Sequence, residues 1–91
     1  MQEDVQMNFE KIIGELFALV TELETIEQEY QFARGRANAH ADKAAEGDVW
    51  ARHLYCGAKL RMLELEERTC EIETRISEIE ISFSMMEVHS A

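Results

Sequence analysis

Apolar residues recur along the first half of the chain at alternating steps of four and three positions. This spacing runs without a break from Val5 to Ala44, which is more than five heptads. Steps of four and three keep apolar side chains on one face of an α-helix, and a heptad repeat of this length is typical of a coiled coil. The pattern predicts one long helix over about residues 3–45. Its apolar stripe consists of Val5, Phe9, Ile12, Leu16, Leu19, Leu23, Ile26, Tyr30, Ala33, Ala37, His40 and Ala44.

The second half of the chain repeats the pattern and predicts another long helix over about residues 49–88. Between the two helices, Gly47 suits the position just after a helix, where a left-handed backbone is favoured. Asp48 suits the N-cap of the helix that follows. A turn is therefore expected at about residues 46–48. The second stripe consists of Ala51, Tyr55, Ala58, Met62, Leu65, Thr69, Ile72, Ile76, Ile79, Phe83 and Met86.

The two stripes match when the chain folds back on itself. Tyr30 then faces Leu65 and Leu19 faces Ile76, and the residue numbers in every such layer add up to 95. The fold point falls between residues 47 and 48, where the capping residues place it independently. The sequence therefore predicts a single all-α domain, an antiparallel two-helix coiled-coil hairpin with helices about 60 Å long. An interruption of the first helix near Gly35 is the alternative.

Charged residues beside the stripes indicate how the two helices meet. The line along which the two apolar stripes meet is here called the seam. In this register Glu22 lies opposite Arg75 and Glu29 lies opposite Arg68, and these oppositely charged pairs lie on one side of the seam.

The other side of the seam combines repulsion with extra apolar residues. Glu27 meets Glu66 there, and Arg34 meets Lys59. Two apolar faces on one helix indicate two neighbours. We expect a homodimer that closes into a four-helix bundle, and the alternative is docking of a foreign protein on this side. The dimer-interface candidates are Ile13, Phe17, Val20, Cys56, Leu60, Leu63 and Cys70.

The net charge of −10 narrows the range of partners. Phosphate backbones and anionic membranes repel such a chain, so direct binding to nucleic acid or to a membrane is not expected. No apolar run approaches the roughly 20 residues of a membrane span. The charge is also segregated, because residues 1–30 carry −7, residues 64–91 carry −6 and residues 31–63 carry +3. Folding would join the two acidic segments into an open end of −13 opposite a basic turn end.

Both ends are candidate contact surfaces for a partner protein. A dense carboxylate surface can compete for a basic groove that normally takes nucleic acid. The basic turn end could bind an acidic patch, with Trp50 as the expected hot spot. The acidic candidates are Glu22, Glu24, Glu71 and Glu73. The basic candidates are Arg34, Arg36, Arg52, Lys59 and Arg61.

Residues that carry chemistry are sparse. His53 and Cys56 share a helix face, but two ligands do not make a metal site, and no second Cys/His cluster accompanies them. No phosphate-binding loop or nucleophile motif is present, so we expect neither an enzyme nor a cofactor. Cys56 and Cys70 lie about 21 Å apart on one helix. They are expected to be buried, reduced thiols of a cytoplasmic protein. The first four residues lack a basic stretch, so no secretory signal is expected.

The run Trp50-Ala51-Arg52-His53 resembles a stretch of the host-nuclease inhibitor (Gam) proteins of lambdoid phages and covers four residues of the chain. In size, acidity and helical content the chain also looks like the small inhibitors that phages and mobile elements make against host defence complexes. Together with the charge pattern, this predicts an inhibitor that blocks a nuclease or a CRISPR effector. The alternative is an assembly factor or chaperone that holds a partner helix in its apolar groove.

Overall fold

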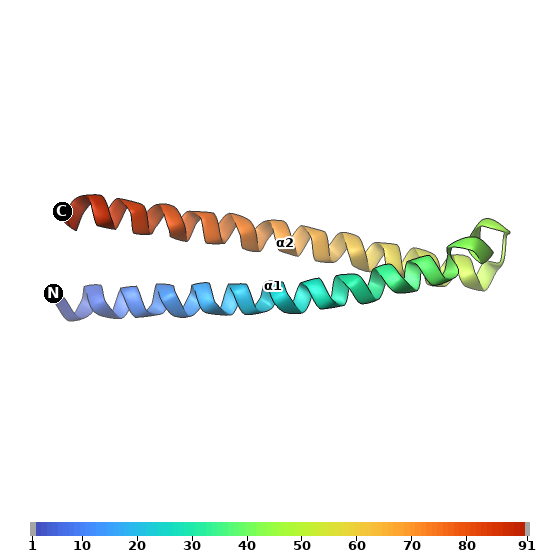
Figure 1. Cartoon of the computed structure of the whole chain (residues 1–91), viewed down its shortest axis with the longest axis horizontal. Coiled ribbons are helices and arrows are strands. Elements are labelled where there is room, and N and C mark those ends of the chain that lie inside the picture. The colour runs from blue at the N-terminus through green and yellow to red at the C-terminus, as the bar shows by residue number, and fades with distance from the viewer. Residues whose placement is uncertain (1, 91) are drawn as a thin grey trace.

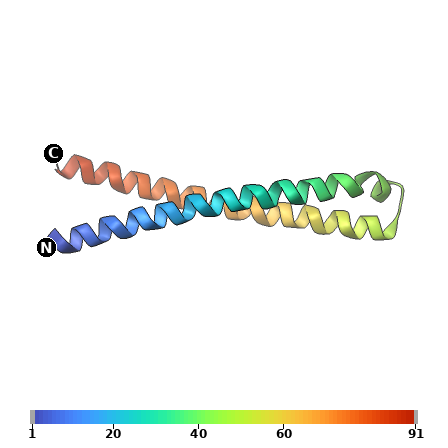
Figure 2. The same ribbon diagram turned by 60° about the horizontal axis from the view of Figure 1, so that its bottom comes forward.

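The computed structural model describes the backbone of residues 2–90 and the side chains of residues 8–86. Helix α1 runs from Gln2 to Ala45 and helix α2 from Val49 to Ser90. They lie side by side and antiparallel, with both termini at one end and the turn at the other (Figure 1). A second view shows them crossing at a shallow angle near mid-length (Figure 2). The rod measures 66 × 18 × 13 Å. The predicted all-α antiparallel hairpin is confirmed.

The turn is built by the capping residues. Gly47 has a φ of 96°, in the left-handed region that a residue without a Cβ adopts at little cost. Its N–H donates to the Ala44 carbonyl and the Asp48 N–H donates to the Lys43 carbonyl, both at 3.1 Å, which is a Schellman motif. The Asp48 carboxylate then accepts a 2.9 Å hydrogen bond from the Ala51 N–H and caps α2. The reversal therefore satisfies backbone groups at both helix ends.

The core lies along the seam, and its composition changes along the rod. Near the turn it consists of Met62 and three alanines, Ala33, Ala37 and Ala58, whose small side chains let the helices approach closely. Helix α1 passes through Gly35 without interruption, so the expected alternative of a break is wrong. All nine side chains that are buried among residues 8–86 belong to the predicted stripes: Ile26, Ala33, Ala37, Ala51, Ala58, Met62, Leu65, Ile72 and Ile79.

Larger residues fill the middle of the seam, and the seam becomes more exposed toward the termini. Ile72 is the best-buried large side chain described, at 1% exposure. Leu19 and Ile76, expected to pair as a buried layer, are only half-buried. Further toward the termini, the Phe9 and Phe83 rings meet edge to face at 5.3 Å. Among the described stripe residues, the buried ones therefore lie between the level of Ile79 and the turn, and those nearer the termini are half-buried or exposed.

Candidate protein-interaction surfaces

Three arginines of α2 close one side of the seam with an evenly spaced set of ion pairs, here called the ladder. Each arginine spans to a glutamate of α1 and also contacts the glutamate three residues ahead of it on α2. Two of the cross-helix pairs are bidentate, which is the geometry that best matches guanidinium to carboxylate. The cross-helix pairs are Arg61 with Glu29 at 2.6 Å, Arg68 with Glu22 at 2.8 Å, and Arg75 with Glu15 at 2.6 Å.

The ladder corrects part of the predicted register. Glu22 was expected opposite Arg75 and Glu29 opposite Arg68, but both glutamates instead reach the arginine one heptad nearer the turn on α2. Heptad positions determine which side of the seam a residue faces. They do not determine which of two flanking partners, each within reach of a long side chain, it contacts. The predicted side was right and the predicted partners were wrong.

Hydrogen bonding in the ladder shifts proton affinities. The hydrogen bonds that Arg75 donates to Glu15 lower the pKa of Glu15 below its ordinary value, and the same hydrogen bonds raise the pKa of Arg75. Glu64 and Glu29 raise the pKa of Arg61 in the same way. These side chains remain well solvated, so each pair stabilises the hairpin only modestly. The main effect of the ladder is to cover this side of the seam with paired charge.

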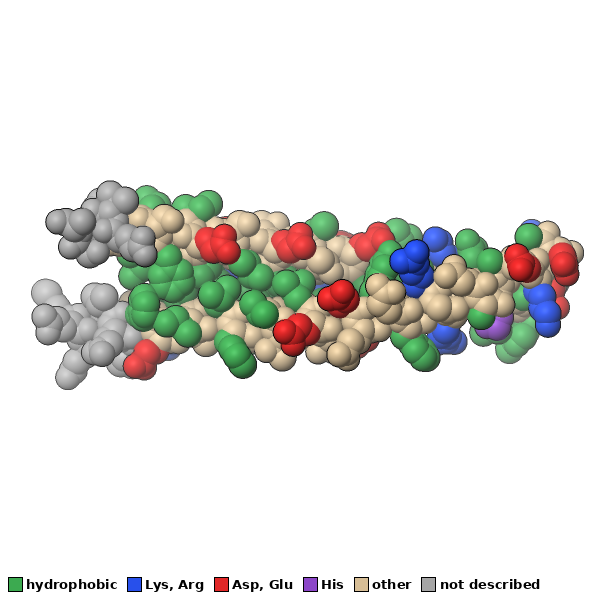
Figure 3. Space-filling model, in the orientation of Figure 1, with side chains coloured by type: hydrophobic (Ala, Val, Ile, Leu, Met, Phe, Trp, Pro, Cys, Tyr) green, Lys and Arg blue, Asp and Glu red, His purple; other side chains and the backbone are tan. Residues whose placement is uncertain are grey.

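The opposite side, here called the apolar face, has no ladder among the described side chains. Phe17 is 74% exposed and Leu63 is 61% exposed, and Val20 and Leu60 are exposed as well. The view in Figure 3 shows apolar side chains along the seam with acidic ones on both helices beside them. The structure places every predicted dimer-interface residue at the surface of the single chain. These residues are Ile13, Phe17, Val20, Cys56, Leu60, Leu63 and Cys70.

A shallow groove marks the middle of the apolar face. Its floor includes Leu23 and Ile26, and Cys70 lies on its wall. The Tyr30 hydroxyl donates a 3.0 Å hydrogen bond to Glu66 across the groove, and this bond raises the pKa of Tyr30. Glu66 was expected to meet only the repulsion of Glu27, but this hydrogen bond from α1 offsets part of it.

Both cysteines depart from expectation. Cys56 and Cys70 were expected to be buried, yet each is an exposed free thiol in the hairpin. They flank the seam stripe and are not members of it, so their side chains point sideways along the apolar face. Only a further neighbour on that face would bury them.

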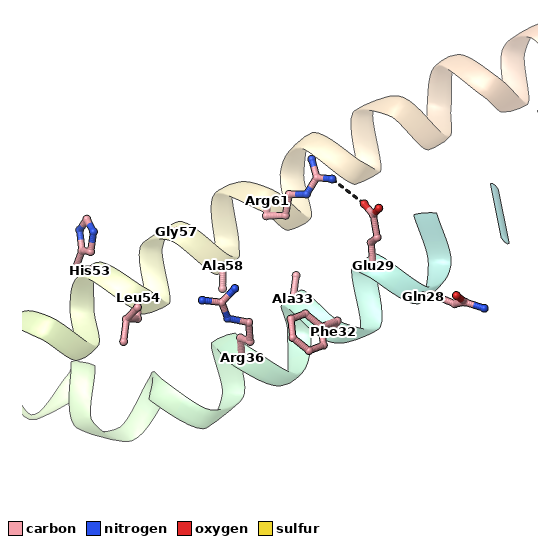
Figure 4. A pocket seen from close by; sticks show the side chains of 10 residues that line it. All are labelled: Gln28, Glu29, Phe32, Ala33, Arg36, His53, Leu54, Gly57, Ala58 and Arg61. Atoms are coloured by element: carbon pink, nitrogen blue, oxygen red, sulfur yellow. Dashed lines mark hydrogen bonds and ion pairs between the residues drawn. The ribbon is translucent and has the colours of Figure 1, made fainter. Parts of the chain in front are cut away.

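The turn end combines exposed aromatic rings with basic side chains. Trp50 is 70% exposed and stacks on His53 with ring centroids 5.8 Å apart. On α1, the Arg36 guanidinium lies 5.9 Å from the centre of the Phe32 ring, which is also 70% exposed. Figure 4 shows Phe32 and Arg36 of α1 beside Ala33 and Ala58, where a hollow lies over the small residues of the seam. Sequence reasoning missed Phe32, although a lone aromatic residue off the stripe is the available signal.

The charged partner-binding candidates fall into two groups. Glu22, Glu71 and Arg61 are engaged in the ladder. The remaining candidates form no ion pair within residues 8–86 and project into solvent: Glu24, Glu73, Arg34, Arg36, Arg52 and Lys59.

Within the described part of the chain, no group of three metal-binding side chains comes together. No buried side-chain polar atom there lacks a hydrogen-bond partner. Neither helix, over the residues described, is apolar enough along its length to cross a membrane. Comparison with protein-family models, curated proteins and solved structures finds no match to the chain.

Proposed function

We propose that this chain is a non-enzymatic, acidic protein-binding module that occupies a basic groove of a nucleic-acid-processing protein and blocks it. The supporting observation is the charge of the end that holds the termini. The hairpin brings residues 2–30 beside residues 64–90, and these two segments together carry a net charge of −13. They extend over about 45 Å at 1.5 Å per helical residue, which is one net charge per ~3.5 Å.

That spacing is close to the charge spacing of one strand along the axis of duplex DNA, which is about 3.4 Å per phosphate. A groove lined with Lys and Arg to hold one strand of a stacked helix would therefore meet a similar linear charge on this rod. Binding of this kind is steered by the summed field and weakens as salt screens it.

The carboxylates that best serve such contacts are those outside the ladder. Glu24 and Glu67 are exposed and take part in no ion pair within residues 8–86. Glu22 and Glu71 share Arg68, so a partner would have to compete with a pair already made. Contacts of a partner with Glu24 and Glu67 therefore cost less free energy than contacts with the ladder glutamates, because no existing ion pair has to be broken.

An acidic rod of this size fits the role of an inhibitor made by a phage or a mobile element. Its target would be a nuclease or a CRISPR effector, and its place of action the cytoplasm that holds these enzymes. The charge comparison supports this assignment, and the four-residue resemblance of Trp50–His53 is in keeping with it.

A second candidate is an assembly factor or chaperone that holds a partner helix. The observation that favours it is the exposed apolar face, on which Phe17 and Leu63 stand largely free. Such binding would be insensitive to salt and abolished by Phe17→Asp or Leu63→Asp. Salt dependence therefore distinguishes the two functions.

The test is capture from a host lysate on the immobilised chain at low salt, followed by elution with a single-stranded DNA oligonucleotide. Proteins bound through a nucleic-acid groove should be released by the oligonucleotide and not by an uncharged polymer. The double variant Glu24→Lys/Glu67→Lys should capture much less of the same proteins. The proposal would be overturned if the captured proteins stayed bound in excess oligonucleotide and the double variant captured them in the same amount.

The matched control reverses two acids near the turn. Asp42 and Glu46 are exposed and lie in the basic part of the chain. Asp42→Lys/Glu46→Lys changes the net charge by the same amount as the first variant. If capture follows the position of the charge, this control keeps its capture. Equal loss in both variants would indicate a nonspecific effect of net charge.

A further inference from the structure

The apolar face needs a cover that the single hairpin does not provide. Phe17 and Val20 on α1 and Leu60 and Leu63 on α2 are exposed there. The ladder covers only the other side of the seam. An exposed apolar surface running along two helices is typical of an interaction site.

The exposed area is large enough for a stable interface. The chain exposes 7290 Å², whereas a compact monomer of its 10.5 kDa mass would expose about 5,400 Å². The excess, about 1,900 Å² on that scaling, is more than twice the roughly 800 Å² that each partner buries in a standard interface. A partner that lies along the rod could therefore bury a full interface within the surface that the elongated shape leaves exposed.

Charge along this face indicates the partner. On α2 the residues beside the seam change sign along the rod, with Arg52 and Lys59 toward the turn and Glu66, Glu73 and Glu80 toward the termini. Two copies laid in the same direction would set acidic half against acidic half. Two copies laid end for end would set each acidic half against a basic one. Such self-complementarity is what a two-fold symmetric interface requires.

We infer that a second copy of the chain covers the apolar face end for end, forming an antiparallel homodimer and a four-helix bundle. A two-fold axis across the face sets α2 against α2 of the second copy. The midpoint of α2 lies between Thr69 and Cys70, beside the central groove. With full overlap, Cys70 of each copy lies near the axis and Lys59 is level with Glu80 of the other copy. This inference is independent of the proposed function, because the occupant is the chain itself.

The first test is the mass of the purified chain in solution at micromolar concentration, measured by sedimentation or light scattering. The wild type should have twice the 10.5 kDa chain mass. Leu63→Asp should shift the mass toward the monomer while helix content is kept, because Leu63 is exposed in the single hairpin. Phe32→Asp is the matched control and should leave the dimer intact, since Phe32 is equally exposed but lies off this face. A wild-type monomer would overturn the inference, as would loss of the dimer in the control alone.

The second test determines the direction of the two copies with a short bis-maleimide cross-linker. Cys56→Ser retains only Cys70, which should cross-link the dimer efficiently. Cys70→Ser retains only Cys56, and the two copies of Cys56 would lie about 40 Å apart along the axis. That variant should give almost no cross-linked dimer. A dimer with both copies in one direction would cross-link through either cysteine, which would overturn the antiparallel arrangement.

A charge swap tests the direction of the two copies independently of the cysteines. Lys59→Glu and Glu80→Lys should each weaken the dimer severalfold, and the double variant should recover most of the wild-type affinity. If the double variant is weaker than either single variant, the two residues do not face each other and the arrangement is wrong.

Discussion

Ile72 offers the most direct test of how the hairpin is held together. It is 1% exposed in the middle of the seam and packs in a cluster with Ile26 and Leu65. Ile72→Ala removes three carbon atoms from this site. At ~0.8 kcal/mol for each buried carbon, the lost transfer free energy is about 2.4 kcal/mol. A cavity would add to this cost, but a seam of two helices can partly close, so we expect a total loss of about 2–3 kcal/mol.

Ile81 is the matched control, because it lies on the same helix and is 61% exposed. Both substitutions gain the same helix propensity from alanine, so the difference between them isolates burial. Ile81→Ala should change stability by no more than ~0.5 kcal/mol. Urea unfolding followed by circular dichroism, with all proteins at one chain concentration, gives the two values. If Ile72→Ala cost less than about 1 kcal/mol, or no more than the control, the seam would not be packed as described.

Three further substitutions test helix α1, the turn and the ladder. Gly35→Ala should stabilise α1 by about 0.5–1 kcal/mol, because the Cβ of the new alanine meets open space. Gly47→Ala should destabilise the protein by at least ~1 kcal/mol, because the backbone φ there is 96°. Thermal unfolding measures both changes in stability, and changes of the same sign would contradict the turn geometry. The lowered pKa of Glu15 should make wild type more stable than Glu15→Gln above pH 4.5, its ordinary value, and this advantage should disappear as the pH falls through the lowered pKa. Denaturation of both proteins across this range tests the effect, and a constant difference down to strong acid would contradict the pairing with Arg75.

The fold could be predicted because its two strongest signals are local. Every buried residue in the described range 8–86 lies on a stripe with four-three spacing, and the reversal lies at a glycine and an aspartate whose backbone preferences suit a helix end and a helix start. These signals depend only on neighbouring residues, so one sequence is enough to read them.

The ion-pair partners and the burial of side chains beside the seam could be predicted less well. Arg68 reaches Glu22 and not Glu29, because a long side chain can choose between partners on successive heptads. Cys56 and Cys70 are exposed because their burial depends on a neighbour beyond the hairpin. Phe32 escaped notice because a single aromatic residue off the stripe has no periodicity to reveal it. In each case the deciding contact is between helices or copies and leaves little trace in local sequence.

The proposed function is tested most directly by competition for a nucleic-acid site. A nucleic-acid-processing protein captured by the chain is first bound to a fluorescent single-stranded oligonucleotide, and the chain is then titrated in while anisotropy is followed. The account predicts that the wild type displaces the oligonucleotide, that added salt weakens this displacement, and that Glu24→Lys/Glu67→Lys displaces it poorly. The proposed function would be contradicted if the oligonucleotide stayed bound in a ternary complex and if wild type and variant changed the anisotropy equally.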